Sequence, residues 1–495
     1  MQCLEDVSEH DARHAHHPRT LIVPAVSRSV AVVSSYDISL VQGPEETRRI
    51  STGDAGFDRV LGGGLVPNGV VAIDGPPGIG KSTLLLMTAA NITRRGGGVL
   101  IATGEETVKQ VGATARRLGA NVSGLRVFAT QSLDQVFEEL RLLKAAGFVV
   151  HLLIVDSVQA MRVARVSSPI GSQWMVGAVG EDLRQYAKDP GSELAVIAVS
   201  QVTKDGLMAG PKALEHAVDT VLSFGRDESD LRYARTKKNR FGAVGEIAQY
   251  EMTSRGLRPL VDPSLMAWQD LAGDTGVAAC VCGHLAKPIV VPIEALVTPA
   301  DDASSGSRGV QVVGVSADRV RFVLDSLARH AGVSFAKSAV RVHVPQVGGD
   351  DVDDAALDLA IAAACWSSLM QKSLGGILFW GSVSLSGKMR SVMRNDSRLE
   401  YSESIRARAV LVRHPGKGLP PARVPVLSLS HLSSLVESIE FLRGRYAREE
   451  EKPRAAEAAM VHNPVDHVGG SSDRSPPGES PGEGESPGQG PPWDE

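Results

Sequence analysis

An eight-residue run with the pattern of a phosphate-binding loop is the clearest chemical signal in the sequence. Its residues, which match GxxxxGK followed by serine or threonine in full, are Gly75, Pro76, Pro77, Gly78, Ile79, Gly80, Lys81 and Ser82. The run lies between an apolar stretch at 70–73 and a helical pattern through 84–94, as such a loop requires. Backbone N–H groups are expected to bind phosphate oxygens, the Lys81 ammonium to lie at the β and γ phosphates, and the Ser82 hydroxyl to bind Mg²⁺. We therefore predict an ATP and Mg²⁺ site that also includes Thr83.

Hydrolysis of a bound triphosphate needs further carboxylates, one near the metal and one near the attacking water. The sequence HLLIVD at 151–156 is an apolar strand that ends in an acid, so Asp156 is predicted to complete the Mg²⁺ shell. Glu105 and Glu106 follow the predicted strand at 99–103, and parallel strands place such residues at the carboxyl edge of the sheet. Either glutamate could activate water. The alternative interpretation is that both are acids favoured by the start of a helix.

Apolar runs alternate with helical patterns along the chain, which predicts a parallel sheet covered by helices. The predicted strands are 70–73, 99–102, 148–155 and 194–199, and the predicted helices are 84–94, 106–118 and 132–146. A composition shift near 259–274 separates an α/β nucleotide-binding domain at 49–265 from a second α/β domain at 275–446. Residues 1–48 are interpreted as an N-terminal arm, and residues 447–495, rich in Pro, Gly, Ser and Glu, as a disordered tail.

Length and composition limit the classes of protein that the chain can represent. Its 495 residues predict two or three domains. The 52 basic and 57 acidic residues give a formal net charge of -5, so contact with nucleic acid requires a local patch. Four cysteines in so long a chain do not predict a disulfide framework. The sequence has no signal-peptide pattern and no apolar run of about 18 residues, which predicts a cytoplasmic protein without a membrane span.

Three further segments are distinctive: IATGEET at 101–107, VTKDGLMAGPKALEHAVDTVLSF at 202–224 and KNRFG at 238–242. Together they resemble the bacterial RadA (Sms) family of recombination and repair ATPases. The resemblance covers about residues 51–445. It implies a RecA-like motor that assembles as a hexameric ring on DNA and drives branch migration of recombination intermediates. It also implies single-stranded DNA, branched intermediates and the RecA recombinase as partners.

The resemblance assigns roles to individual residues. Glu105 falls where RecA-like enzymes keep their catalytic glutamate, and Gln201 falls at the γ-phosphate-sensing end of the strand at 194–199, where the family more often has histidine. The segment after Gln201 corresponds to the DNA-contacting loop of the family. Its Lys204 and Lys212, among glycines, form a basic loop suited to gripping phosphates without reading bases. A plain solvated loop is the alternative.

The KNRFG segment, Lys238, Asn239, Arg240, Phe241 and Gly242, forms part of a basic cluster. Its cations could reach the γ-phosphate of a neighbouring subunit or contact DNA directly. The sequence leaves both interpretations open, together with a third in which the cluster is an ordinary solvated charge run.

Residues 338–392 of the second domain resemble the C-terminal domain of the same family, which is similar in fold to the proteolytic domain of Lon. Lon needs a serine nucleophile before the helix at this place, and here the position is Ala356, so no peptidase activity is expected. The domain is interpreted as a scaffold, with Lys388 and Arg390 as candidate DNA contacts or solvated charges.

The family usually begins with a four-cysteine zinc module, which this chain lacks, and no zinc site is predicted. Cys280, Cys282 and His284 spell CxCxH, but a packed strand is the preferred interpretation.

Three functions compete at this stage. The first is a DNA-dependent ATPase in repair and homologous recombination that moves on single-stranded DNA. The second is a nucleotide-gated protein that binds DNA or a recombinase with negligible turnover. The third is an ATP-dependent protease, which would need a serine that residues 352–358 do not contain.

Overall fold

The computed structural model describes residues 48–189, 191–201, 211–262, 266, 270, 273–283, 287–300, 309–413 and 423–445. The predicted arm up to residue 47 and the predicted tail from 447 lie outside the described residues. A helix with the length and apolar character of a membrane span does not occur in the part of the chain that the structure describes.

The first sheet has nine strands in the order β3-β2-β4-β5-β1-β6-β7-β8-β9. The strands from β3 to β6 are parallel, and β6 to β9 continue the sheet as antiparallel neighbours. Their bounds are β1 Val70–Asp74, β2 Gly98–Thr103, β3 Leu125–Ala129, β4 Val150–Asp156, β5 Ala195–Val199, β6 Thr220–Arg226, β7 Arg232–Asn239, β8 Ile247–Thr253 and β9 Gly256–Leu260. The predicted α/β class is confirmed, and the antiparallel extension is a feature that the strand pattern did not predict.

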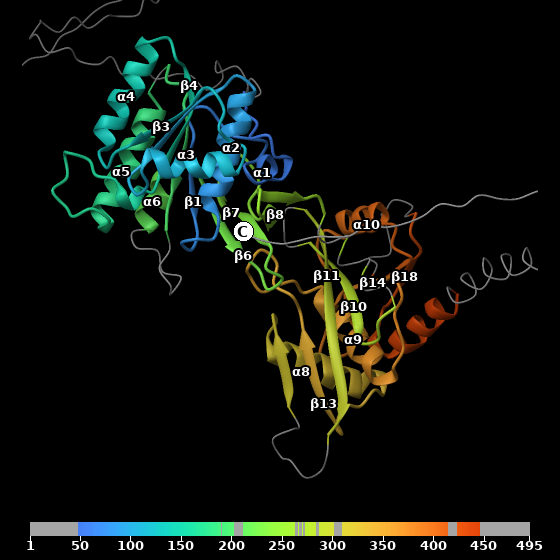
Figure 1. Ribbon diagram of the computed structural model, residues 1–495. Helices are drawn as coiled ribbons and strands as arrows, with labels where there is room; N and C mark the ends of the chain where they lie inside the picture. Colours follow the sequence, from blue (N-terminus) through green and yellow to red (C-terminus); the bar gives the residue numbers. More distant parts are fainter. Residues whose placement is uncertain are drawn as a thin grey trace, which may run out of the picture. The chain divides into compact units, whose positions relative to one another are not determined.

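Each face of this sheet has its own apolar core, because side chains alternate along a strand. In β1, Val71 and Ile73 join one cluster while Val70 and Ala72 join the other. Helices α2 and α3 cover the first face, and α4 and α5 cover the second (Figure 1). The helices are α1 Ala55–Val60, α2 Lys81–Arg94, α3 Val108–Arg117, α4 Leu133–Ala145, η1 Val158–Ala160, α5 Gln173–Ala187 and α6 Pro211–Ala217.

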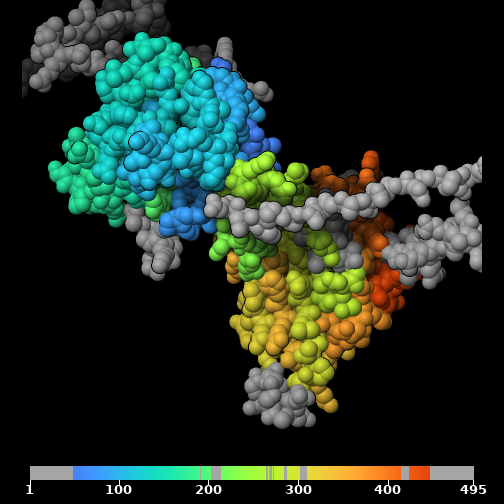
Figure 2. Space-filling view, viewed as in Figure 1, coloured from blue at the N-terminus to red at the C-terminus, as the bar shows by residue number. Residues whose placement is uncertain are grey.

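The second sheet has seven strands in the order β12-β13-β11-β10-β14-β17-β18. Its strands are β10 Val277–Cys282, β11 Ile289–Pro299, β12 Val310–Val313, β13 Ser338–His343, β14 Ile377–Trp380, β17 Ala409–Val412 and β18 Val426–Ser428, with β15 Ser382–Val383 and β16 Met389–Arg390 forming a separate pair. Its helices are α8 Ala317–Ser326, η2 Leu327–Ala331, α9 Leu357–Met370, α10 Asn395–Ser404 and η3 Leu432–Ser434. In the space-filling view the residues coloured blue to teal gather in one rounded mass, and the residues coloured yellow to red gather in another (Figure 2).

Helix α9 is the centre of the second core. Its sequence LDLAIAAACWSSLM is apolar on nearly every side, and every residue from Leu357 to Ser368 is buried. A helix without a polar face must be enclosed, and its alanines let it lie close to β10, β11 and β14. Cys280 and Cys282 are fully buried in β10 beneath it, as predicted for a packed strand, and burial raises the pKa of the Cys282 thiol.

A buried ion pair joins Asp354, just before α9, to Arg398 in α10. Asp354 and Arg398 are 7% and 2% exposed, and Arg398 Nη2 lies 2.8 Å from Asp354 Oδ2. The same carboxylate accepts the backbone N–H groups of Gly283 at 2.8 Å and Ala356 at 2.9 Å. The Arg398 guanidinium also donates to the carbonyl of Val281. Every buried charge here is therefore paired and hydrogen-bonded, which is the condition for tolerating charges in a core.

Replacing Asp354 with alanine is expected to lower the free energy of unfolding by about 3–5 kcal/mol, because it leaves the Arg398 guanidinium buried without its counter-ion. Urea unfolding followed by fluorescence reports on this core, since Trp366 and Trp380 are fully buried in it. Asp318→Ala removes an exposed pair with Arg321 and serves as the control, with a change below about 1 kcal/mol. Equal unfolding curves for the two variants would contradict the assignment.

Candidate nucleotide site

The phosphate-binding loop joins the end of β1 to the start of α2. A side chain at Gly75 is excluded by the neighbouring strand, because an added Cβ would lie 2.1 Å from the carbonyl oxygen of Phe224. Gly80 has φ +114°, a conformation that L side chains rarely adopt, and it directly precedes the first helical residue. The loop glycines are therefore required by backbone shape, and the structure has the strand–loop–helix arrangement that the motif predicts.

Lys81 is folded back into its own loop. Its ammonium donates to the carbonyl oxygens of Gly75 at 2.6 Å and Pro76 at 2.9 Å, and the residue is only 6% exposed. Burial lowers the pKa of Lys81, while the nearby carboxylates of Asp156, Asp74 and Glu105 act in the opposite direction. The two carbonyl oxygens accept hydrogen bonds from the ammonium group. Phosphate oxygens of a bound nucleotide are predicted to replace them.

The two residues predicted to hold Mg²⁺ are in direct contact. Ser82 Oγ donates to Asp156 Oδ2 at 2.8 Å. Burial raises the pKa of Asp156, the charge of Glu105 adds to that increase, and the Ser82 hydrogen bond and the Lys81 charge oppose it. A hydroxyl and a carboxylate at one point are oxygen ligands of the kind that Mg²⁺ takes beside phosphates, so this donor set fits the ion.

Glu105 belongs to a hydrogen-bonded group at the carboxyl edge of the sheet. The Gln201 amide Nε2 lies 2.9 Å from Glu105 Oε1 and 3.1 Å from Oε2, and the Ser157 hydroxyl donates to the same carboxylate. Glu106 also lies near the site, and burial, Asp156 and Glu105 raise its pKa. The structure thus brings Glu105, Gln201 and Asp156 together, whereas the Glu106 side chain has no hydrogen bond to another described residue.

Several contacts around the site could not be predicted from the sequence. Gln159 donates through Nε2 to the Ser200 hydroxyl at 2.9 Å and to the Gln201 carbonyl at 3.2 Å. Arg232 donates through Nε to the Ile79 carbonyl at 3.2 Å, and so supports the phosphate-binding loop from β7. Lys237 forms an ion pair at 3.2 Å with Asp74, the last residue of β1. Only the antiparallel strands bring β7 to the loop, which is why spacing could not reveal these contacts.

The two segments that distinguish the RadA-like sequence pair with each other. Lys238 Nζ donates to the carbonyls of Glu215 at 2.5 Å and Val218 at 2.8 Å at the end of α6. Arg240 lies 3.1 Å from Asp219 Oδ1, and the buried Asp219 also binds Lys188 at 3.2 Å. Burial lowers the pKa of Lys238, and Arg240 lowers it further. In this chain the cations are therefore engaged by backbone carbonyls and a carboxylate.

The remaining residues of KNRFG hold the turn after β7. Asn239 Oδ1 accepts from the Thr220 hydroxyl at 3.1 Å and from the Phe241 N–H at 2.9 Å. An added Cβ at Gly242 would lie 2.8 Å from the Cα of Gly62, so only glycine fits. The Phe241 carbonyl accepts from Arg49 Nη2 at 2.8 Å. The turn therefore packs on the first residues of the domain.

Other predicted contacts are placed as follows. Lys204 and the side chain of Lys212 lie outside the described residues. Lys388 lies just before β16 and Arg390 is its last residue, and both side chains are exposed. Their predicted role in DNA contact stays a prediction.

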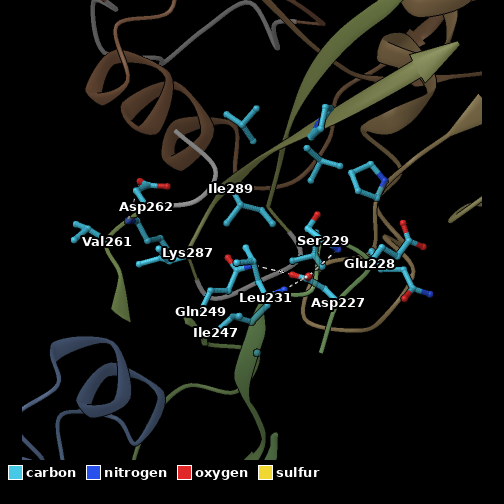
Figure 3. A pocket seen from close by; sticks show the side chains of 18 of the residues that line it. Asp227, Glu228, Ser229, Leu231, Ile247, Gln249, Val261, Asp262, Lys287 and Ile289 are labelled. Atoms are coloured by element: carbon cyan, nitrogen blue, oxygen red, sulfur yellow. Dashed lines mark hydrogen bonds and ion pairs between the residues drawn. The ribbon is translucent and has the colours of Figure 1, made fainter. Parts of the chain in front are cut away.

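A cavity of about 650 Å³ lies apart from the phosphate-binding loop. Figure 3 shows Asp227 at its wall, with hydrogen bonds to neighbours in the turn after β6 and to Gln249. Burial raises the pKa of Asp227. The residues that line this cavity include none of those predicted to bind nucleotide, so it takes no part in the site.

Comparison with known proteins agrees with this geometry. Residues 38–177 match the family described as the RecA N-terminal domain. The DNA repair protein RadA of Escherichia coli is 37% identical over 407 residues, which cover 81% of this chain and 83% of that protein. The RadA proteins of Pseudomonas aeruginosa and Aquifex aeolicus are each 35% identical, over 401 and 370 residues, and cover 80% and 74% of this chain and 85% and 80% of their own lengths.

The parallel sheet, the phosphate-binding loop and the carboxylates at its edge define a P-loop ATPase of the RecA type. More narrowly, the chain belongs to the RadA family of DNA repair proteins. The resemblance seen in the sequence is thereby confirmed.

Replacing Lys238 with alanine is expected to lower the free energy of unfolding by about 1–3 kcal/mol, because two carbonyls at the end of α6 lose their donor. Chemical denaturation measures the change, and retention of ATP by the folded variant separates it from damage to the phosphate-binding loop. Lys144→Ala is the matched control, since Lys144 is an exposed lysine in the last turn of α4. If Lys238→Ala is as stable as this control, the carbonyl contacts do not support α6.

Proposed function

We propose that the chain hydrolyses ATP with Mg²⁺ and uses the energy to move along single-stranded DNA, promoting branch migration of recombination intermediates in the cytoplasm. In this proposal it works as a hexameric ring beside the RecA recombinase. The RadA relatives are DNA repair proteins, which supports the general class of function. The contacts described above support the hydrolytic step.

The proposed mechanism starts with an exchange of partners at Lys81. Phosphate oxygens replace the carbonyls of Gly75 and Pro76, so the ammonium neutralises negative charge where the β–γ bond breaks. Ser82 and Asp156 would hold Mg²⁺, which when bound supplies positive charge to the same phosphates. Glu105 then accepts a proton from water as the water oxygen attacks the γ-phosphorus and ADP leaves.

The link between Glu105 and Gln201 is the observation that carries the proposal. The Gln201 amide contacts both carboxylate oxygens, so Gln201 and the Ser157 hydroxyl together orient the proposed general base. Gln201 is also the residue after which the segment predicted to contact DNA begins. A conformational change in that segment on binding DNA would therefore alter the position of Glu105 through the Gln201 side chain.

The alternative is a nucleotide-gated binding protein with negligible turnover. An intact set of Lys81, Asp156 and Glu105 favours hydrolysis over binding alone. Phosphate release measured with and without single-stranded DNA separates the two: stimulation by DNA supports the motor, and tight DNA binding without turnover supports the alternative.

We also propose that the second domain is not a protease, because Ala356 at the predicted nucleophile position carries no hydroxyl and is fully buried.

Lys81→Ala is expected to reduce ATP turnover to background, because it removes the charge that offsets the phosphates during bond cleavage. The steady-state rate of phosphate release measures this loss, and the circular dichroism spectrum checks that the fold is retained. Normal hydrolysis by this variant would show that the phosphate-binding loop is not the site of turnover.

Glu105→Gln is expected to lower the catalytic rate by about 10²–10⁴-fold while ATP binding is retained, since the amide cannot accept the proton of water. Glu106→Gln is the matched control, because it makes the same change one residue away from the Gln201 contact. A loss confined to Glu106→Gln would assign the base to the other glutamate.

A further inference from the structure

The last residue of β1 is a buried acid that directly precedes the phosphate-binding loop. Asp74 lies opposite Ser223 of the neighbouring strand β6, and almost none of its surface reaches solvent. A carboxylate in such a place is tolerated only when it is paired. Its negative charge would also repel the phosphates of a nucleotide bound to the adjacent loop. For both reasons the charge of Asp74 has to be balanced.

Lys237 of β7 balances this charge. Its ammonium nitrogen lies 3.2 Å from Oδ2 and 3.5 Å from Oδ1 of Asp74, and the carboxylate has no other hydrogen-bond partner among the described residues. The side chain of Lys237 is 48% exposed, whereas that of Asp74 is 2% exposed. Water can therefore solvate the lysine when its partner is removed, but it cannot solvate the acid. The pair is asymmetric, because only loss of the lysine leaves a buried charge without compensation.

An irregularity in the pairing of β6 with β7 gives Lys237 a position of its own. Thr236 lies opposite Leu222 and Lys238 lies opposite Val221, so Lys237 is an extra residue without a counterpart in β6. Such a bulge redirects a side chain, and bulges are common next to functional sites. Lys238 donates to carbonyls at the end of α6, whereas Lys237 reaches across β6 to the end of β1. The two successive lysines therefore have separate partners.

Asp74 also lies close to the lysine of the phosphate-binding loop. Burial lowers the pKa of Lys81, and Asp74 is one of three carboxylates whose charges oppose this effect. The Lys81 ammonium nevertheless donates to the carbonyls of Gly75 and Pro76, and the ammonium that binds Asp74 is that of Lys237. An ionised carboxylate is a stronger acceptor than a carbonyl. Without Lys237, Asp74 would therefore compete with the phosphates for Lys81.

We propose that Lys237 is a positioning residue for nucleotide binding, which neutralises Asp74 and so leaves the Lys81 ammonium free to move from the loop carbonyls to the phosphates. This inference rests on the proposed function, because it concerns the same ATP site. Lys237 does not touch the nucleotide in this role and acts only through Asp74. The role is distinct from those considered for Lys238 and Arg240, whose partners are the end of α6 and Asp219.

The test measures the affinity of the full-length protein for a nonhydrolysable ATP analogue with Mg²⁺, by titration calorimetry without DNA. Lys237→Met is expected to weaken binding by roughly 10- to 100-fold, as for one uncompensated charge at an effective dielectric constant of about 20. Asp74→Asn is expected to bind at least as tightly as wild type, since the remaining lysine is solvated. The double variant, which has neither charge, is expected to recover most of the affinity that Lys237→Met loses.

The kinetics of hydrolysis separate this role from a catalytic one. A charge that acts equally on bound ATP and on the transition state changes KM and leaves kcat nearly unchanged. Lys237→Met is therefore expected to raise KM and to reach the kcat of wild type when ATP is saturating. Lys144→Met, which removes an exposed lysine in the last turn of α4, is the matched control and should leave KM unchanged.

Three results would overturn the inference and leave the proposed function intact. They are equal weakening by the two single variants, failure of Asp74→Asn to rescue Lys237→Met, and unchanged affinity in a Lys237→Met variant whose stability is reduced. The second result would assign Lys237 a phosphate contact of its own, and the third would make the ion pair purely structural.

If Lys237→Met does not fold, the Asp74→Asn and double variants decide the question. Affinity at the wild-type level in both supports the inference, and weaker binding by either contradicts it. A wild-type protein that binds no ATP analogue with Mg²⁺ present would instead refute the proposed function, and the inference would fail with it.

Discussion

The nucleotide site is arranged around one buried ammonium group, whose positive charge must be balanced by oxygen atoms. Lys81 is enclosed at the point where β1 becomes α2, and a charge in that position is tolerated only when oxygen atoms surround it. Two loop carbonyls meet this need, and Asp74, Asp156 and Glu105 lie near enough to influence its ionisation. The site is therefore built around positive charge held by weak ligands that phosphate oxygens can replace.

The parts of the fold that could be predicted depend on local sequence, and the parts that could not depend on tertiary pairing. Consecutive apolar residues at 70–73 and a complete loop motif predicted β1, α2 and the phosphate site. The pairing of Arg240 with Asp219 could not be predicted, because it exists only once β7 folds back beside β6. Gln159 was missed for the same reason, since its partner Gln201 is 42 positions away.

The sequence segments that mark the family have a structural explanation in this chain. Arg240, Asn239 and Lys238 contact Asp219, Thr220 and the end of α6 in turn, so two distant segments form one unit. Asp219 also accepts the Val70 N–H at 3.1 Å, which fixes the first residue of β1. A role at DNA or at a neighbouring subunit would therefore have to act through groups that also hold the sheet together.

The ion pair between Asp354 and Arg398 has a consequence for the chemistry that the second domain could acquire. If the resemblance to Lon reflects common descent, restoring a hydroxyl at position 356 would not by itself recreate a hydrolase. That position is sealed from solvent, and Asp354 and Arg398 stand beside it, locked by their mutual attraction. A reactive hydroxyl at this position would also require changes to the ion pair, and a change to either partner alone would leave the other buried without its counter-charge.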